Sequence, residues 1–226
     1  DVANLFDQQT VIQVNPQDAG SASERRVSVE MIDFADGSPI QVDAGMRMNG
    51  NASRNPNRGK HNFRLAFRNE YGAGKLRFPL FGSDAPTETF NQIILRGGNG
   101  NSWVHPTAAV RQYGMYIRDQ WFRDARFAMG YPEALQNEVH VYFNGLYFGM
   151  HHLFERIEEE WTAERFGGEE DDWEGFRIVG GNRIEVIKGT PAEVNARMLD
   201  SWRAVLDAAE AGNLTAVEEY LDMDSF

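Results

Sequence analysis

The chain has 226 residues, of which 42% are hydrophobic and 25% charged, so it is long enough and apolar enough to bury a core. It contains no cysteine, which excludes a disulfide scaffold, a thiolate nucleophile and any Cys-ligated zinc or iron–sulfur site. No apolar run approaches the roughly 20 residues that cross a bilayer, so no membrane span is predicted.

Charge is distributed unevenly along the chain. The formal net charge of −12 at pH 7 argues against general nucleic-acid binding, because a polyphosphate is repelled at long range. Residues 44–82 run against this trend, with one acid, Glu70, and eight bases: Arg47, Arg54, Arg58, Lys60, Arg64, Arg68, Lys75 and Arg77. This local charge of +7 predicts a region that meets anions. The ten acids between Glu155 and Glu174 are interpreted as a solvated helix and loop.

Period-two patterns predict the first strands at 25–33, at about 39–48, at about 60–68 and at 91–96. The polar run 49–59, rich in Gly, Asn and Pro, is predicted to be a loop between the second and third strands. The third strand is expected to place apolar side chains on one face and polar ones on the other: Phe63, Leu65 and Phe67 against Lys60, Asn62, Arg64 and Arg68.

Apolar residues at three- and four-residue steps then predict one amphipathic helix over about 107–128, with Tyr113 and Trp121 in the core. Asn144-Gly145 between two apolar runs predicts a β-hairpin, because a type I′ turn needs positive φ at both central residues.

The pattern of predicted secondary structure changes at about residue 158. The sequence there predicts a short acidic helix, a Gly-Gly break and two short strands near 176–179 and 183–187. Thr190-Pro191 is expected to open a long helix at about 191–211, and Gly212-Asn213 to end it. The last residues, 220–226, are typical of the start of another helix, which suggests a piece of a longer protein.

An antiparallel sheet with one inserted helix, a Gly-containing polar loop and a following basic residue resembles the small lobe of a kinase. Backbone N–H groups and a lysine can together cradle phosphates, which carry too much charge to bind without donors. The loop from Gly50 to Gly59 is neither a G-x-G-x-x-G loop nor a Walker A motif. A surface turn with basic neighbours on a solvated strand is the alternative.

A series of short blocks carries a closer resemblance, in this order: 46–54 (MRMNGNASR), 60–65 (KHNFRL), 80–82 (LFG), 93–96 (IILR), 116–119 (YIRD), 143–150 (FNGLYFGM), 153–156 (LFER) and 221–226 (LDMDSF). From about residue 25 to the end, the chain resembles the spore-coat H (CotH) protein kinase family.

The resemblance implies an α+β, atypical protein-kinase-like fold that uses ATP and Mg²⁺ to phosphorylate a secreted or coat protein. It implies a lead-in at 1–24, a β-rich small lobe at 25–157 and the start of a helical lobe at 158–226, incomplete at its C-terminus. The catalytic and metal-binding aspartates are expected beyond residue 226, so this piece alone is expected to be inactive. An extracellular or cell-envelope location goes with the family.

The resemblance also implies roles for individual residues. The loop that covers the phosphates would contain Gly50, Asn51, Ser53 and Arg54. Lys60 would contact the phosphates, although the neighbouring arginines compete for this phosphate role. Asp119 on the predicted helix, or a neighbour of Asp119, would orient Lys60. The hinge beside the adenine would contain Phe154, Glu155 and Arg156.

The rival function is a non-catalytic module for cell-surface adhesion or carbohydrate binding on a kinase-like fold. Its candidate sugar-stacking platform consists of four tryptophans: Trp103, Trp161, Trp173 and Trp202. A zinc site has little support, because no H-E-x-x-H is present and His151-His152 on a strand would face opposite sides of the sheet.

Overall fold

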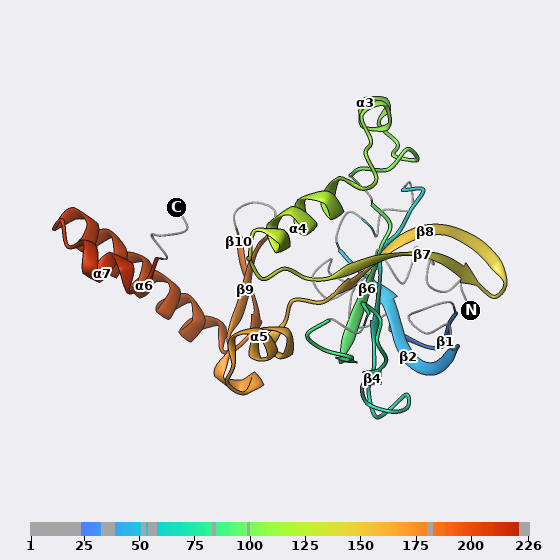
Figure 1. The fold of residues 1–226 in the computed structure, drawn as a ribbon, viewed down its shortest axis with the longest axis horizontal. Helices are drawn as coiled ribbons and strands as arrows, with labels where there is room; N and C mark the ends of the chain where they lie inside the picture. Colours follow the sequence, from blue (N-terminus) through green and yellow to red (C-terminus); the bar gives the residue numbers. More distant parts are fainter. Residues whose placement is uncertain are drawn as a thin grey trace. The chain divides into compact units, whose positions relative to one another are not determined.

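The computed structural model describes residues 24–32, 39–50, 53, 58–82, 85–98, 100–179 and 183–221 (Figure 1). Helices and a curled antiparallel sheet combine in an α+β fold. The chain divides into two compact units, Asp1–Ile157 and Glu158–Phe226. Most of the final LDMDSF block, residues 222–226, lies outside the described residues.

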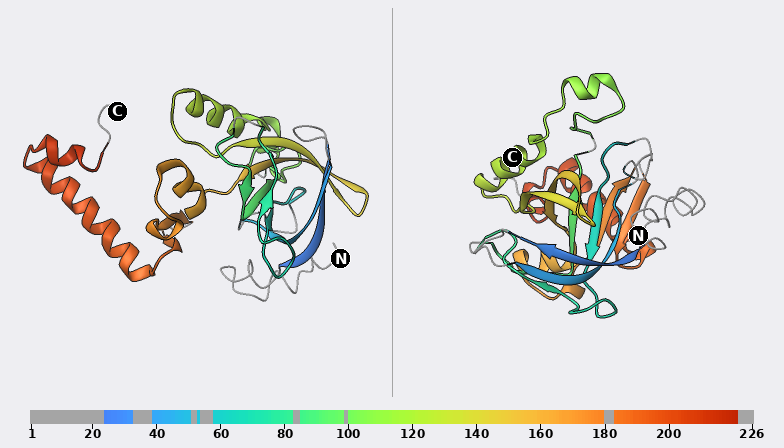
Figure 2. Two further views of the ribbon diagram at one scale, coloured as in Figure 1. Left: turned by 60° about the horizontal axis from the view of Figure 1, so that its bottom comes forward. Right: turned by 90° about the vertical axis from the view of Figure 1, so that its right-hand side faces the viewer.

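The first unit is built on a six-stranded antiparallel sheet that curls into a half-barrel, with the strand order β1-β2-β3-β6-β8-β7 (Figure 2). Its strands are β1 (Arg25–Met31), β2 (Ile40–Met48), β3 (Phe63–Ala66), β6 (Gln92–Arg96), β7 (Gln136–Phe143) and β8 (Leu146–Glu155). A separate short ladder pairs β4 (Leu76–Arg77) with β5 (Thr89–Phe90).

The hydrophobic core lies against one face of this sheet. Phe63 and Leu65 on β3 are buried with Ile93 and Leu95 on β6, as the period-two pattern requires. Phe63 also packs edge-to-face on Phe143, with 5.1 Å between the ring centroids. The apolar face predicted for the third strand is therefore confirmed.

The polar side of the third strand differs from the prediction. β3 begins only at Phe63, so Lys60 lies in the loop before it. Arg64 is not solvated, since 7% of its surface is exposed.

The single helix predicted over 107–128 is wrong. The structure has two helices, α3 (Ala108–Gln112) and α4 (Arg118–Ala128), with a break between them. Gly114 lies in this break, and its carbonyl accepts a hydrogen bond from Trp103 Nε1 at 2.8 Å instead of joining a helical ladder. Tyr113 and Trp121 are 71% and 63% exposed, so the prediction that they belong to the core is also wrong.

The predicted hairpin is confirmed. β7 and β8 are joined by Asn144 and Gly145, whose φ angles of 50° and 79° are those of a type I′ turn. The ladder then shifts register, because Val141 pairs with Gly149 whereas Tyr142 pairs with Tyr147. Gly149 has a φ of 112°, so this irregularity is a bulge that suits glycine.

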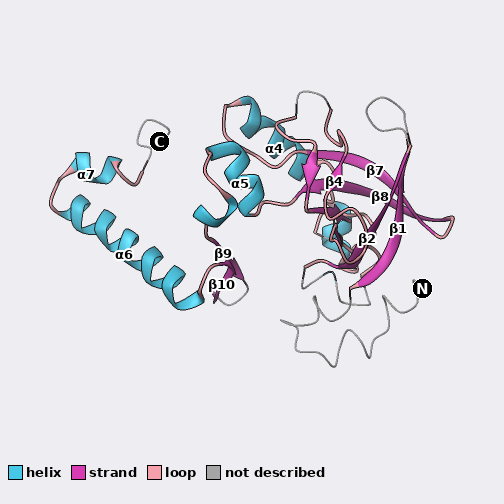
Figure 3. Cartoon of the chain, turned by 90° about the horizontal axis from the view of Figure 1, so that it is seen from below, coloured by secondary structure: helices cyan, strands magenta, loops and turns pink. Residues whose placement is uncertain are grey.

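The second unit contains short elements and one long helix (Figure 3). These are α5 (Glu159–Phe166), the 3₁₀ helix η2 (Glu170–Asp172), β9 (Gly175–Val179), β10 (Arg183–Lys188), α6 (Pro191–Glu210) and α7 (Leu214–Glu218). All but η2 and α7 were predicted from the sequence. Asn213 explains the start of α7, because its side chain accepts a hydrogen bond from Ala216 N at 3.2 Å. Among the described helices, none has the length and apolar character needed to cross a membrane.

Candidate functional site

Lys60 is tied into the interior of the first unit. Its ammonium donates hydrogen bonds to the hydroxyl of Tyr116, at 3.1 Å, and to the carbonyl of Met150 on β8. The Nζ atom also lies 4.4 Å from the centroid of the Tyr116 ring, in a cation–π contact. Burial lowers the pKa of Lys60. The lysine thus links the loop before β3 to β8 and to the segment before α4.

The bulge at Gly149 lies against this lysine. A Cβ atom at Gly149 would lie 3.4 Å from Lys60 Cε, and the positive φ disfavours any other residue. Tyr116 completes the arrangement, because its hydroxyl donates to the Met150 carbonyl at 2.5 Å. Burial raises the pKa of Tyr116, which keeps its hydroxyl neutral and able to donate.

Two histidines on β8 pack on opposite sides of this arrangement. The His151 ring is fully buried, with Nε2 at 3.0 Å from the carbonyl oxygen of His61, and burial lowers its pKa to about 4. His152 stacks on Tyr116 with 4.3 Å between centroids, and its Nε2 lies 3.0 Å from the Tyr116 carbonyl oxygen. Both rings are therefore engaged with backbone carbonyls. Within the described ranges, no three His, Asp or Glu side chains converge to hold a metal ion.

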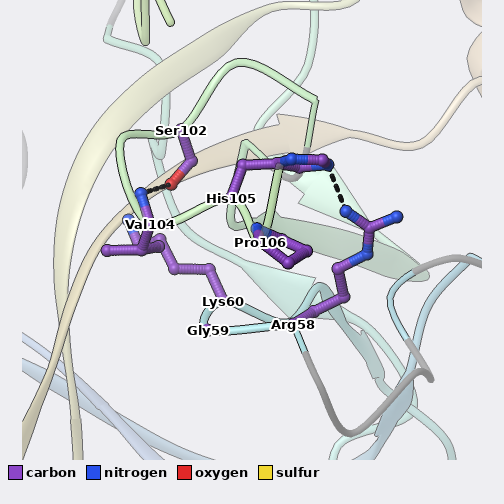
Figure 4. A pocket seen from close by; sticks show the side chains of 7 residues that line it. All are labelled: Arg58, Gly59, Lys60, Ser102, Val104, His105 and Pro106. Carbon is purple, nitrogen blue, oxygen red and sulfur yellow. Dashed lines mark hydrogen bonds between the residues drawn. The ribbon is translucent and has the colours of Figure 1, made fainter. Parts of the chain in front are cut away.

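A pocket beside Lys60 is lined by Arg58, Gly59, Lys60, Ser102, Val104, His105 and Pro106 (Figure 4). Arg58 Nη1 contacts His105 Nε2, and the other ring nitrogen of His105 faces Thr107 N at 3.0 Å. A neutral imidazole has one acceptor nitrogen, so His105 satisfies only one of these two donors. The Nε atom of Arg58 is buried and has no hydrogen-bond partner. Arg58 therefore contributes a buried donor to the lining of this pocket.

A second charged arrangement joins the sheet to α4. Arg96 Nη2, at the end of β6, lies 2.5 Å from Asp119 Oδ2, and Asn101 Nδ2 donates to Asp119 Oδ1 at 3.0 Å. The guanidinium of Arg123 on α4 covers the ring of Phe154, with 4.9 Å between Arg123 Cζ and the ring centroid. The helix is therefore held over β6 and β8 by one ion pair and one cation–π contact.

Of the four residues predicted to form the phosphate-covering loop, the structure describes two, Gly50 and Ser53. Gly50 follows β2 with a φ of 80°, which glycine adopts without strain. Ser53 is buried, and its hydroxyl accepts a hydrogen bond from the backbone N–H of Asn62. This hydroxyl therefore anchors the loop. Asn51 and Arg54 lie outside the described residues.

The remaining predicted residues make contacts within the first unit. Asp119 binds Arg96 and Asn101, and not Lys60, whose described partners are Tyr116 and Met150. At the predicted hinge, Phe154 and Glu155 are buried at the end of β8.

The hinge side chains are engaged close to the strand. Glu155 Oε2 accepts a hydrogen bond from Leu135 N at 2.8 Å. Arg156 Nη1 donates to Gln92 Oε1 at 3.3 Å. These contacts hold the end of β8 against β6 and the start of β7.

Sequence reasoning missed the roles of Arg96 and Tyr116. The position of Arg96 was a usable signal, because it ends a predicted strand just before a predicted helix that carries an acid. Tyr116 gave no such signal, since its partners Lys60 and Met150 are 56 and 34 residues away.

The four tryptophans of the suggested sugar platform differ in exposure. Trp103 and Trp202 are 67% and 59% exposed, but Trp161 is buried. Trp103 belongs to the first unit and the other three to the second. The buried Trp161 has no free face for a sugar ring.

Comparison of the chain with known protein families and with curated proteins finds no match.

Proposed function

We propose that this chain is the nucleotide-binding portion of an atypical protein kinase of the CotH type, which transfers the γ-phosphate of ATP to a secreted or coat protein. The observation that carries the proposal is the ion pair between Arg96 and Asp119. In protein kinases, a cation on a strand is held by a carboxylate on the following helix, and the pair orients the phosphates. Arg96 ends β6, and Asp119 lies on α4, in the helical segment that follows that strand.

The order of elements supports the same proposal. The loop that begins at Gly50 joins two neighbouring strands, β2 and β3. After β6 the chain forms the helical segment and returns through the β7–β8 hairpin, which puts β8 beside β6. A polar loop, a strand cation and a helix carboxylate thus follow each other as a kinase small lobe requires.

This order changes the role proposed for Lys60. The strand before the helix is β6, so the orienting ion pair is assigned to Arg96 and Asp119. Lys60 is assigned to hold the loop before β3 against β8, because its ammonium is already bonded to Met150 and Tyr116.

Buried arginine donors support the binding of ATP phosphates, whereas no three His, Asp or Glu side chains among the described residues converge to hold the metal. The Nε atoms of Arg58 and Arg64 are buried without a hydrogen-bond partner in the described part of the chain, and an anion would satisfy such groups. Mg²⁺ neutralises charge on the transferred phosphoryl group when carboxylates hold it. The proposal leaves those carboxylates, with the catalytic aspartates, outside residues 1–226, as the resemblance implies, and an extracellular or cell-envelope location remains part of it.

The nucleotide-binding part is tested by measuring the affinity of labelled ATP for the 226-residue chain, for Arg96→Met and for the control Arg126→Met. Arg126 lies on α4 and pairs with Glu133 at 2.8 Å on the surface. We expect weak binding that falls with salt, a further loss in Arg96→Met only, and weaker binding of adenosine, which has no phosphates. Equal affinities for ATP and adenosine would contradict the proposal.

The transfer step is tested separately by incorporation of radiolabelled phosphate. We expect none from the 226-residue chain and autophosphorylation by a chain extended beyond Phe226 that includes the expected aspartates. A folded extended chain that has these aspartates and incorporates no phosphate would favour the adhesion or carbohydrate-binding alternative.

A further inference from the structure

Two arginines lie directly opposite each other on the face of the sheet away from the hydrophobic core. Arg47 on β2 pairs in register with Arg64 on β3. Side chains opposite each other in antiparallel strands have Cβ atoms about 5 Å apart, and like charges there destabilise the sheet. Both are removed from water, since 16% of the Arg47 side chain and 7% of Arg64 are exposed.

The nearby negative charge is shared among several donors. Glu24 Oε2 lies 3.7 Å from Arg47 Nε, but the same carboxylate lies 3.3 Å from Arg68 Nη1 and accepts a hydrogen bond from Tyr71 at 3.0 Å. Gly45 leaves the space for this group, because a Cβ atom there would overlap both Glu24 and Tyr71. One carboxylate therefore serves two arginines and a hydroxyl.

Among the described residues, the ion pairs of Glu24 are with Arg47 and Arg68 and do not include Arg64. In the part of the chain that the structure describes, the Arg64 side chain makes no hydrogen bond or ion pair, and its Nε atom is buried without a partner. An arginine side chain stays charged at any ordinary pH, so it does not escape the cost of burial by losing its proton. A buried guanidinium next to a second arginine is the environment of a site that an anion completes.

The same row of the sheet continues from charged to apolar residues. Arg64 pairs in register with Ile94 on β6, and Ile94 pairs with Phe154 on β8. From Arg47 on β2 to Phe154 on β8 the row crosses three inter-strand spacings, a span of about 14 Å. At the apolar end the ring of Phe154 is buried and covered by the Arg123 guanidinium, so the candidate ligand contacts lie at the charged end of the row.

We infer that Arg47 and Arg64 bind the phosphate chain of a nucleotide on this face of the sheet. Two guanidinium groups offer forked donors that match phosphate oxygens. Arg96 lies two residues beyond Ile94 on β6, where its guanidinium is held by Asp119. The identity of the ligand rests on the proposed function, whereas the burial of Arg64 without a counter-ion among the described residues does not.

The test uses sodium tripolyphosphate, a phosphate chain without a nucleoside, and measures the melting temperature of the 226-residue chain and its affinity for this anion. Arg64→Met keeps the length of the side chain and removes its charge. We expect the melting temperature without ligand to rise, because a buried unpaired charge is removed, and the affinity to fall about tenfold or more. The matched control Arg77→Met changes an exposed arginine on β4 and should alter neither quantity.

The outcomes separate this inference from the proposed function. A lower melting temperature in Arg64→Met with unchanged tripolyphosphate affinity would overturn the inference. If Arg64→Met fails to fold, Arg64→Lys decides, because it keeps the charge but loses the fork: a weaker affinity supports the site, and an equal one overturns it. Binding of tripolyphosphate that depends on Arg64, without binding of ATP, supports the phosphate site and contradicts the nucleotide function.

Discussion

Arg96 Nη2 on β6 lies 2.5 Å from Asp119 Oδ2 in the first turn of α4. The two side chains are 39% and 30% exposed, so solvent screening limits their contribution to stability to about 1 kcal/mol or less. Asp119 also favours the helix start, because a negative charge there complements the helix dipole. The main consequence of the pair is the placement of the Arg96 guanidinium.

We therefore predict that Asp119→Asn changes the free energy of unfolding by about 1 kcal/mol or less but weakens ATP binding, because Arg96 loses its charged anchor. The control is Asp124→Asn on the same helix, where the acid is exposed. Urea denaturation and ATP titration of both variants check this. Equal ATP affinity in Asp119→Asn and Asp124→Asn would remove Asp119 from the nucleotide site.

A second prediction concerns Lys60. On a solvated strand face, its removal would leave stability unchanged, but the structure bonds its ammonium to Tyr116 and Met150. Lys60→Met should lower the free energy of unfolding by about 1 kcal/mol, since a net hydrogen bond contributes that much. A double-mutant cycle with Tyr116→Phe should show coupling between the two side chains. Additive effects would show that the contact does not stabilise the protein.

The turn of the β7–β8 hairpin provides a third prediction. Gly145 has a φ of 79°, and a Cβ atom there would meet no neighbour within 4 Å, so only the backbone conformation resists a side chain. Gly145→Val should destabilise the first unit by about 1 kcal/mol or more. Gly100→Val is the control, because Gly100 is also in open space and has no positive φ. Similar melting temperatures for the two variants would contradict the turn geometry.

A fourth prediction follows from His151. Burial lowers its pKa from 6.5 to about 4, so between these values the unfolded chain binds a proton that the folded chain excludes. The stability that neutral His151 contributes is therefore complete above pH 6.5 and is lost as the pH falls toward 4. The loss amounts to about 3 kcal/mol.

The measurement is the free energy of unfolding from urea denaturation at several pH values between 7 and 4. Carboxylates also titrate at the acid end, so the wild type is compared with His151→Gln, which keeps a polar side chain but does not titrate. The variant should lose less stability across this range. Parallel pH profiles for the two proteins would show that His151 is not buried in its neutral form.

Strands and the hairpin were predictable because their signals are local. Phe63 and Leu65 alternate with polar residues, and Asn144-Gly145 specifies its turn through its own backbone preferences. The helix predicted over 107–128 failed for the opposite reason. Its break depends on Trp103, which captures the carbonyl of Gly114 from outside the periodic segment.

The candidate site was predictable only in part. The basic region was visible as a count of charges, but the count does not say which cations are buried or paired. Lys60 is bonded to Met150, 90 residues away, and the pairing of β2 with β3 puts Arg64 opposite another arginine, with no counter-ion among the described residues. Such relationships depend on strand register, which sequence patterns do not specify between distant segments.

The most direct test of the nucleotide-binding claim is a ¹⁵N–¹H NMR titration of the 226-residue chain with ATP at millimolar concentration. We predict that backbone amides shift at Gly50, at Arg64 and around Arg96, whereas those of α6 in the second unit do not. Adenosine at the same concentration should produce smaller shifts around Arg64, because it lacks the phosphate chain. The absence of shifts with ATP, or shifts confined to α6 and α7, would contradict the claim that the β-rich unit binds a nucleotide.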